Sequence, residues 1–173
     1  MEYQPNIYLT NQTDTYRYAL GMEGKKMLAV MGLNPSKANL HKPDTTLRKV
    51  LGFAERNGYN GFIMLNICAK RETFPNNLPK HLNQSLHQKN LNTIKTVLAK
   101  HAVKEIWAAW GNIIEVRPYL KQALNDIFQM TYTSTECNWI QLGELTKGGH
   151  PRHPSRAGYE LSFLEFNIEN YLK

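Results

Sequence analysis

Residues 26–33 read Lys-Met-Leu-Ala-Val-Met-Gly-Leu, and Asn34-Pro35-Ser36 follows them directly. Nearly continuous apolar runs of this length are typical of strands that are buried on both faces of a parallel sheet. Pro35 ends the run because proline lacks the backbone N–H that a sheet ladder needs. We therefore expect a central strand here, with a polar turn at its carboxyl end.

Three further segments have the same form, since Gly61–Ile67, Glu105–Trp110 and Trp139–Leu142 are short apolar runs next to polar or turn residues. Segments with helical apolar spacing lie between them. This alternation predicts right-handed crossovers and helices on both faces of the sheet. We expect one α/β domain over residues 1–173, with three layers (α/β/α) and a mostly parallel sheet of about four strands. The expected helices cover residues 45–57, capped by Asp44 or Thr45, then 90–101 and 117–129.

The remaining segments give weaker patterns. Tyr16–Leu20 is expected to be a short edge strand, and Met130–Thr133 another short strand. Residues 158–172 are expected to form a closing amphipathic helix with Ser155 as its N-cap. Free N–H groups at such a helix start suit a phosphate.

Composition excludes several classes of protein. The chain has 42% hydrophobic residues, two cysteines and no apolar run long enough to span a membrane. Its N-terminus lacks the features of a signal peptide, and two cysteines are too few for a disulfide framework. We expect a cytoplasmic protein without cofactor, metal or membrane contact, and no obligate protein partner is evident. His150 and His153 alone make a poor zinc site, because no Cys or acidic residue stands at ligand spacing.

The net charge of +7 favours a polyanionic partner, although a basic solvated surface would also explain it. The positions of the basic residues say more about a binding partner than the total charge does. Basic residues in or beside the strand-end segments would form a positive rim suited to a phosphate backbone. They are Lys37, Lys70, Arg71, Lys147, Arg152 and Arg156.

Polar residues at the strand ends allow two interpretations each. Asn34 either turns the chain or holds a water or ligand. Asn66 interrupts an apolar run, so its amide either bonds to nearby backbone or reads the edge of a planar ligand. Trp110 is either core or a ligand platform, and Gly111 permits a tight turn or close backbone approach. Asp44 either caps a helix or shapes a pocket.

The segment Gly148–Arg156 is the densest in reactive side chains. Two glycines precede two prolines, so a stiff loop should carry two imidazoles and two guanidiniums. No Gly-x-Ser-x-Gly elbow, Walker A loop or Gly-x-Gly-x-x-Gly loop is present in the sequence.

Together these motifs resemble the uracil-DNA glycosylase superfamily. Gly32–Ser36 is similar to that family's water-activating Gly-Ile-Asn-Pro-Gly, and Met64-Leu65-Asn66 to its base-reading Leu-Leu-Asn. Trp110-Gly111 follows the third strand as in the family, and His153-Pro154-Ser155 matches its last motif. The chain also resembles the DUF1643 family of small bacterial and phage proteins, through Leu-Asn-Pro-Ser near its start and Pro-Arg-His-Pro near its end.

The resemblance implies a DNA glycosylase that flips a base out of DNA and hydrolyses its N-glycosidic bond. Asn34 would orient water, His153 would stabilise charge on the departing base, and Asn66 would bind the base edge. Further base contacts would come from Leu33, Trp110, Gly111 and Asp44. Contacts to DNA phosphates would come from Ser36, Lys37, Arg71, Arg152, Ser155 and Arg156.

Two departures from the superfamily bear on the substrate. Asn34 stands where the fastest uracil-excising members carry Asp, and an amide is no base. Ser36 and Lys37 stand where uracil-specific members carry an aromatic residue that excludes thymine. We therefore expect a modified or non-standard base, in DNA repair or anti-phage defence. Two alternatives stay open, an enzyme for free nucleotides or nucleosides on this fold and a non-catalytic DNA-binding module.

Overall fold

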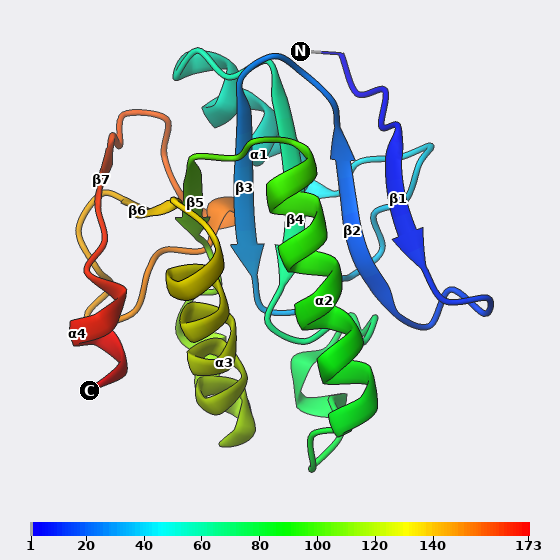
Figure 1. The fold of residues 1–173 in the computed structure, drawn as a ribbon. Helices are drawn as coiled ribbons and strands as arrows, with labels where there is room; N and C mark the ends of the chain where they lie inside the picture. Colours follow the sequence, from blue (N-terminus) through cyan, green and yellow to red (C-terminus); the bar gives the residue numbers. More distant parts are fainter. Residues whose placement is uncertain (1) are drawn as a thin grey trace.

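The computed structural model describes residues 2–173 as a mixed α/β fold around one seven-stranded sheet (Figure 1). The strand order across the sheet is β1-β2-β4-β3-β5-β6-β7. The strands are β1 (Ile7–Thr10), β2 (Arg17–Met22), β3 (Met27–Gly32), β4 (Gly61–Asn66), β5 (Glu105–Ala108), β6 (Asn138–Leu142) and β7 (Phe163–Glu165). The helices are α1 (Thr45–Arg56), α2 (Gln84–Lys100), α3 (Tyr119–Ser134) and α4 (Ile168–Leu172), with short 3-10 turns at Pro75–Asn77, Asn112–Val116 and Pro154–Arg156.

The four predicted apolar strands are confirmed as β3, β4, β5 and β6, which run parallel to one another. The expected total of about four strands, mostly parallel, is wrong. The sheet has seven strands, and three of its six pairings are antiparallel. The added edge strands β1 and β7 have four and three residues, so they leave little periodic signal in the sequence.

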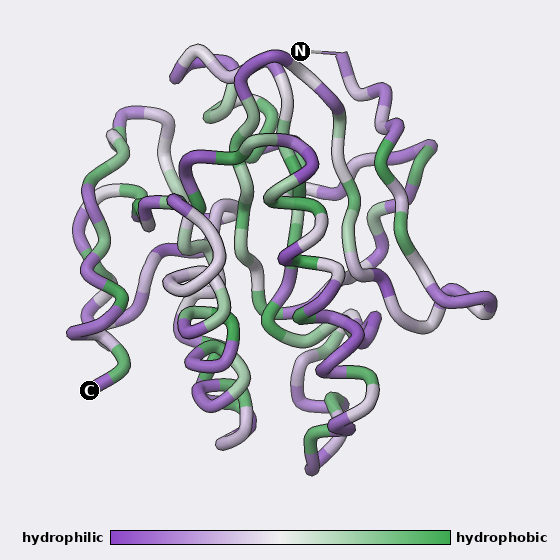
Figure 2. The backbone as a smooth tube through the Cα atoms, in the orientation of Figure 1, coloured by the Kyte–Doolittle hydropathy of each residue, from purple (hydrophilic) through white to green (hydrophobic). Residues whose placement is uncertain are grey.

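Each face of the sheet packs against its own apolar cluster. Side chains alternate along a strand, so β3 sends Met31 to the cluster shared with α2 and α3, and Val30 to the cluster shared with α1. Figure 1 shows α2 and α3 lying side by side across one face of the sheet. Figure 2 shows that the central strands are hydrophobic along most of their length, whereas the connecting loops are mostly hydrophilic.

Three local predictions are wrong. Tyr16–Leu20 corresponds to β2, which is an inner strand because β1 pairs along its outer side. Met130–Thr133 continues α3 rather than forming a strand. The closing helix over residues 158–172 is replaced by β7 and the short α4, because residues 163–165 pair with β6.

Ser155 is therefore not the N-cap of a final helix, since it lies in the 3-10 turn Pro154–Arg156. The cap predicted for the first helix is confirmed, because an Asp44 side-chain oxygen accepts the Leu47 N–H at 2.9 Å.

In residues 2–173, no helix has the length and apolar character required to cross a membrane.

The capping of α2 gives a stability prediction. Asn83 accepts the Leu86 N–H at 3.1 Å. We expect Asn83→Ala to lower the free energy of unfolding by about 1 kcal/mol, because the start of α2 loses a hydrogen-bond partner. Asn92→Ala, in the exposed middle of the same helix, is the matched control and should leave stability unchanged or raise it, since alanine favours helix. Urea unfolding of both variants measures the difference, and equal losses would contradict the capping role.

Candidate active site

The carboxyl ends of the parallel strands open into a cavity of about 330 Å³, here called the site cavity. Asn34, which follows β3, and His153, from the loop after β6, both line it. Residues 119 positions apart in the sequence thus share one space, which the parallel arrangement of strand ends predicts. The lining residues are Arg17, Gly32, Leu33, Asn34, Ser36, Asp44, Thr45, Thr46, Leu47, Met64, Glu72, Thr73, Pro75, Trp110, Ile113, His153 and Ser155.

Asn34 is held rigidly through its amide nitrogen. This NH₂ group donates to the backbone carbonyls of Glu72 at 2.7 Å, Pro35 at 3.1 Å and Lys70 at 3.5 Å. Both amide protons are therefore committed to the backbone. The side-chain oxygen is the remaining hydrogen-bonding group, and it can only accept. Asn34 can consequently orient a water molecule or bind a donor on a ligand.

His153 is a neutral imidazole with a defined tautomer. The Ser155 N–H donates to its Nδ1 at 3.3 Å, and the Ser155 hydroxyl lies 2.8 Å from the same nitrogen. Because Nδ1 accepts, the ring proton sits on Nε2. Burial lowers the pKa of His153; Asp44 opposes this shift and Arg156 adds to it. The ring can therefore donate from Nε2 without carrying a full positive charge.

Asn66, which the sequence predicted to bind a base edge, does not line the site cavity but lies behind Gly32 and Met64, which do. It is 1% exposed, and neither its side-chain nitrogen nor its side-chain oxygen has a hydrogen-bond partner. It stands opposite Gly32 in the β3–β4 register, and an added Cβ on Gly32 would lie 3.1 Å from the Asn66 oxygen. Gly32 and Met64, both lining residues, flank this amide on the same face of the sheet.

A second cavity of about 280 Å³ adjoins the first and shares Trp110, Ile113, His153 and Ser155 with it. We call it the arginine cavity, because Arg152 and Arg156 also line it. Arg152 is anchored by its Nε, which donates to the Glu144 carbonyl at 2.9 Å. The remaining lining residues are Gly111, Asn112 and Thr146.

Gly111 is required at the junction of the two cavities. Its φ of +69° and ψ of −174° fall in a region that only glycine occupies readily, and an added Cβ would lie 3.0 Å from the His153 Cβ. Trp110, by contrast, is fully buried and donates its indole N–H to the Tyr171 hydroxyl at 3.2 Å. It is a core residue that forms a wall of both cavities, and its ring is not an exposed platform.

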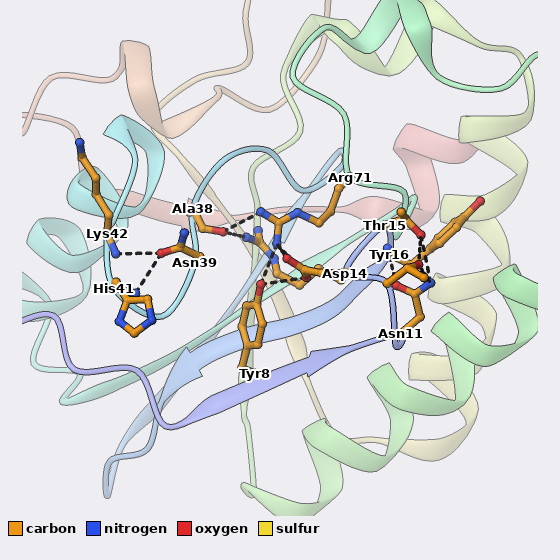
Figure 3. A network of polar contacts seen from close by, with 12 residues as sticks. Tyr8, Asn11, Asp14, Thr15, Tyr16, Ala38, Asn39, His41, Lys42 and Arg71 are labelled. Carbon is orange, nitrogen blue, oxygen red and sulfur yellow. Dashed lines mark hydrogen bonds and ion pairs between the residues drawn. The ribbon is translucent and has the colours of Figure 1, made fainter.

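The other predicted residues divide into two groups. Leu33, Ser36 and Asp44 line the site cavity, and Asp44 both caps α1 and shapes the space. Lys37 and Arg71 line neither cavity. Arg71 is occupied elsewhere, because its guanidinium contacts the Asp14 carboxylate at 3.0 Å and the Tyr8 hydroxyl at 2.7 Å (Figure 3).

The two histidines of the final loop face different partners. Nδ1 of His150 lies 2.7 Å from the Tyr171 hydroxyl, whereas Nδ1 of His153 meets Ser155. Among residues 2–173, no three His, Cys, Asp or Glu side chains are grouped to hold a metal ion.

Several lining residues were not predicted from the sequence. Thr45 and Thr46 belong to the start of α1, so this helix, rather than the last one, presents its N-terminus to the site. Glu72 comes from the loop that Asn34 holds. Arg17 lies in a segment whose only visible pattern is that of a short strand, so nothing in its local sequence distinguishes it from an ordinary edge arginine.

Most of the chain matches one protein family. The pattern of a family described as "Protein of unknown function (DUF1643)" matches residues 17–155. The chain belongs to the DUF1643 family. The match includes both asparagines and the final His-Pro-Ser, and it confirms the resemblance to this family drawn from the sequence motifs. Comparison with curated proteins and with solved structures finds no match.

The bonding of Asn34 predicts how this DUF1643 protein responds to a carboxylate at that position. Asn34→Asp replaces the NH₂ donor with an oxygen that faces three carbonyl oxygens. We expect a loss of about 1–3 kcal/mol in the free energy of unfolding, because the partly buried carbonyl oxygens lose their donor. Thermal or urea unfolding at neutral pH measures it.

Asn112→Asp is the matched control, since the side-chain oxygen of Asn112 accepts from the Thr146 hydroxyl at 2.6 Å and a carboxylate preserves that bond. A variant Asn34→Asp as stable as the Asn112→Asp control would show that the three carbonyl contacts do not hold Asn34.

Proposed function

We propose that the protein is a DNA glycosylase, on a three-layer fold similar to that of uracil-DNA glycosylases. It would hydrolyse the N-glycosidic bond of a modified or non-standard base and leave an abasic site. The observation that carries the proposal is that Asn34 and the neutral His153 line one cavity. The unpartnered Asn66 amide lies directly behind the wall of this cavity.

The Asn66 amide is suited to recognising a base. An amide offers one acceptor and two donors in a plane, which complements the paired donor and acceptor on the edge of a pyrimidine. A buried amide without partners is costly, and a bound base edge would recover that cost. Gly32 places no side chain of its own beside this amide, but the Met64 Cε fills that space, 2.6 Å from where a Gly32 Cβ would lie. A flipped base would therefore reach the amide only after Met64 moves.

His153 would stabilise the leaving base. When the N-glycosidic bond breaks, negative charge moves onto the base and the sugar becomes oxocarbenium-like. A fixed N–H donor facing that charge typically accounts for about 2.7–4 kcal/mol of transition-state stabilisation. The bond from Ser155 to Nδ1 fixes the proton on the opposite nitrogen, Nε2.

Asn34 would direct the attacking water. Its oxygen accepts one water proton and so turns a lone pair of the water outward, towards the sugar carbon. An amide removes no proton, so Asn34 acts by position rather than as a general base. Much of the bond cleavage must therefore precede attack, which fits the stabilisation of the leaving base at His153.

The arginine cavity would bind the DNA backbone beside the flipped nucleotide. Arg152 and Arg156 line it, and His153 and Ser155 separate it from the site cavity. Phosphate contacts supply most of the sequence-independent affinity for DNA, and here they would offset the cost of unstacking a base. Lys37 and Arg71, predicted as further phosphate contacts, remain outside this arrangement.

An abasic-site assay tests the proposal. We expect genomic DNA from phages with different base modifications, and duplexes with single modified bases, to yield alkali-sensitive breaks on at least one substrate. His153→Ala and Asn34→Ala should each reduce the cleavage rate by about 100-fold or more, because each removes an interaction of the transition state. His41→Ala, an exposed histidine outside both cavities, is the control and should cleave normally.

Two results would reject this proposal in favour of another. Tight DNA binding without breaks on any substrate would indicate a DNA-binding module. Turnover restricted to mononucleotides would indicate a nucleotide-processing enzyme.

The lowered pKa of His153 predicts the pH dependence. The proposed donor is the neutral ring, and its folded pKa lies below the usual 6.5. Activity should persist as the pH falls through 6.5 and decline only at lower pH, where the ring gains a second proton. The same shift means that stability is lost as pH falls below the unfolded pKa, because the unfolded chain binds the proton more readily. Single-turnover rates against pH, with an NMR titration of His153, measure both; an acid limb at or above 6.5 would exclude this role.

A further inference from the structure

Arg17 is a buried cation at the site cavity without an acidic partner. It is 3% exposed and lines the cavity, and no carboxylate of residues 2–173 lies within ion-pair distance of it. One terminal nitrogen donates to the Ala38 carbonyl at 2.6 Å, whereas its Nε has no partner. Leaving a charged donor unpaired in the interior is costly, and a bound anion would recover that cost.

A β-bulge directs Arg17 into the cavity. In the β1–β2 register Leu9 stands opposite Ala19, but Thr10 stands opposite Arg17, so Tyr18 is an extra residue on β2. Without the bulge, Arg17 would share the face of Ala19, which packs in the cluster beneath α2. With it, Arg17 points to the α1 side of the sheet. Bulges often re-aim a side chain next to an active site.

No ion pair within residues 2–173 neutralises Arg17, although Asp44 acts on it electrostatically from beyond ion-pair distance. A neighbouring cation, Arg71, also donates to the Ala38 carbonyl but is already paired with Asp14 (Figure 3). Burial and then Arg71 lower the pKa of Arg17 to about 10, which still leaves it charged at neutral pH.

Two carboxylates line the same cavity, and each is tied to the backbone. Asp44 accepts the Leu47 N–H at 2.9 Å, and Glu72 accepts the Phe74 N–H at 3.0 Å. Thr45 and Thr46 add the first turn of α1 to the wall, where backbone N–H groups have no partner within the helix.

We propose that Arg17 and the first turn of α1 bind an oxyanion, a carboxylate or a phosphate, carried by the ligand of the site cavity. The guanidinium fork matches such a group, and a helix N-terminus favours negative charge. Describing that ligand as a base with an anionic substituent rests on the proposed glycosylase function. The binding of an oxyanion does not, because it is measured without turnover.

The first test uses the wild-type protein. Inorganic phosphate is titrated at constant ionic strength against chloride while the Arg17 Nε–H and the Thr45 and Thr46 amides are followed by ¹⁵N NMR. We expect saturable shifts at all three groups. The absence of shifts at the Arg17 Nε–H would overturn the proposal, and this readout requires no variant to fold.

The second test compares charged and neutral ligands by calorimetry. One arm pairs 5-carboxyuracil with uracil, and the other pairs deoxyuridine 5′-monophosphate with deoxyuridine. We expect the anionic member of at least one pair to bind tenfold more tightly or better. A gain in the first arm places the oxyanion on the base, and a gain in the second places it on a nucleotide. Equal binding within both pairs would overturn the proposal.

The variants then assign the effect to Arg17. Arg17→Gln should abolish the preference for the anionic member, while Arg48→Gln, an exposed position on α1 outside the cavity, should retain it. Equal loss in both variants would indicate a general charge effect and overturn the site. Oxyanion binding without abasic-site formation would leave this inference standing and reject the glycosylase, so the two failures are distinguishable.

Discussion

The parallel pairing of β3 with β4 is the constraint on which the rest of the site depends. It sets Gly32 opposite Asn66, so that the strand end without a side chain faces the strand end with an amide. The pairing of β5 on the other side of β3 continues past the strand, since the Ala109 N–H donates to the Met31 carbonyl at 2.9 Å. Both strands are buried on two faces, and a slip of one residue would exchange every side chain between the two apolar clusters. The register of the core therefore fixes which polar groups reach the cavity.

This arrangement places unpaired polar groups where a protein interior normally satisfies them. The Asn66 amide and the Arg17 Nε are both buried and lack partners. Each costs free energy in the folded state, and apolar residues of similar size would avoid that cost. Asn90 is only half satisfied, because its side-chain nitrogen donates to the Asn66 carbonyl at 2.9 Å whereas its side-chain oxygen has no partner. The Tyr18 hydroxyl, the Trp107 indole nitrogen and the Gln141 side-chain oxygen are also buried without a partner. Arg17 differs from them because it carries a charge and lines the site cavity.

The sequence predicted the central strands well because a strand that is buried on both faces has apolar residues at nearly every position, as in residues 26–33. The sequence also predicted that Asn34 and His153 lie at the same edge of the sheet, because the carboxyl ends of parallel strands meet there. It could not reveal the bulge at Tyr18, which depends on pairing with β1 and changes no local pattern. Nor could the sequence show that Arg71 forms an ion pair with Asp14, because that contact joins residues 57 positions apart. The last helix failed as a prediction since Phe163 and its neighbours satisfy an amphipathic helix and a short edge strand equally well.

The two cavities differ in the charges that line them, and the net charge of +7 does not show this difference. In the site cavity, Arg17 shares the lining with the carboxylates of Asp44 and Glu72, so this cavity carries charges of both signs. In the arginine cavity, Arg152 and Arg156 stand with no acidic lining residue. A polyanion would therefore be drawn to the arginine cavity, whereas the group that enters the site cavity would be selected by the geometry of its hydrogen bonds. His153 belongs to both cavities, and its depressed pKa keeps it neutral. Under the proposed function, a protonated ring there would attract a phosphate as readily as a base, so a neutral ring would let the shared wall discriminate between the two.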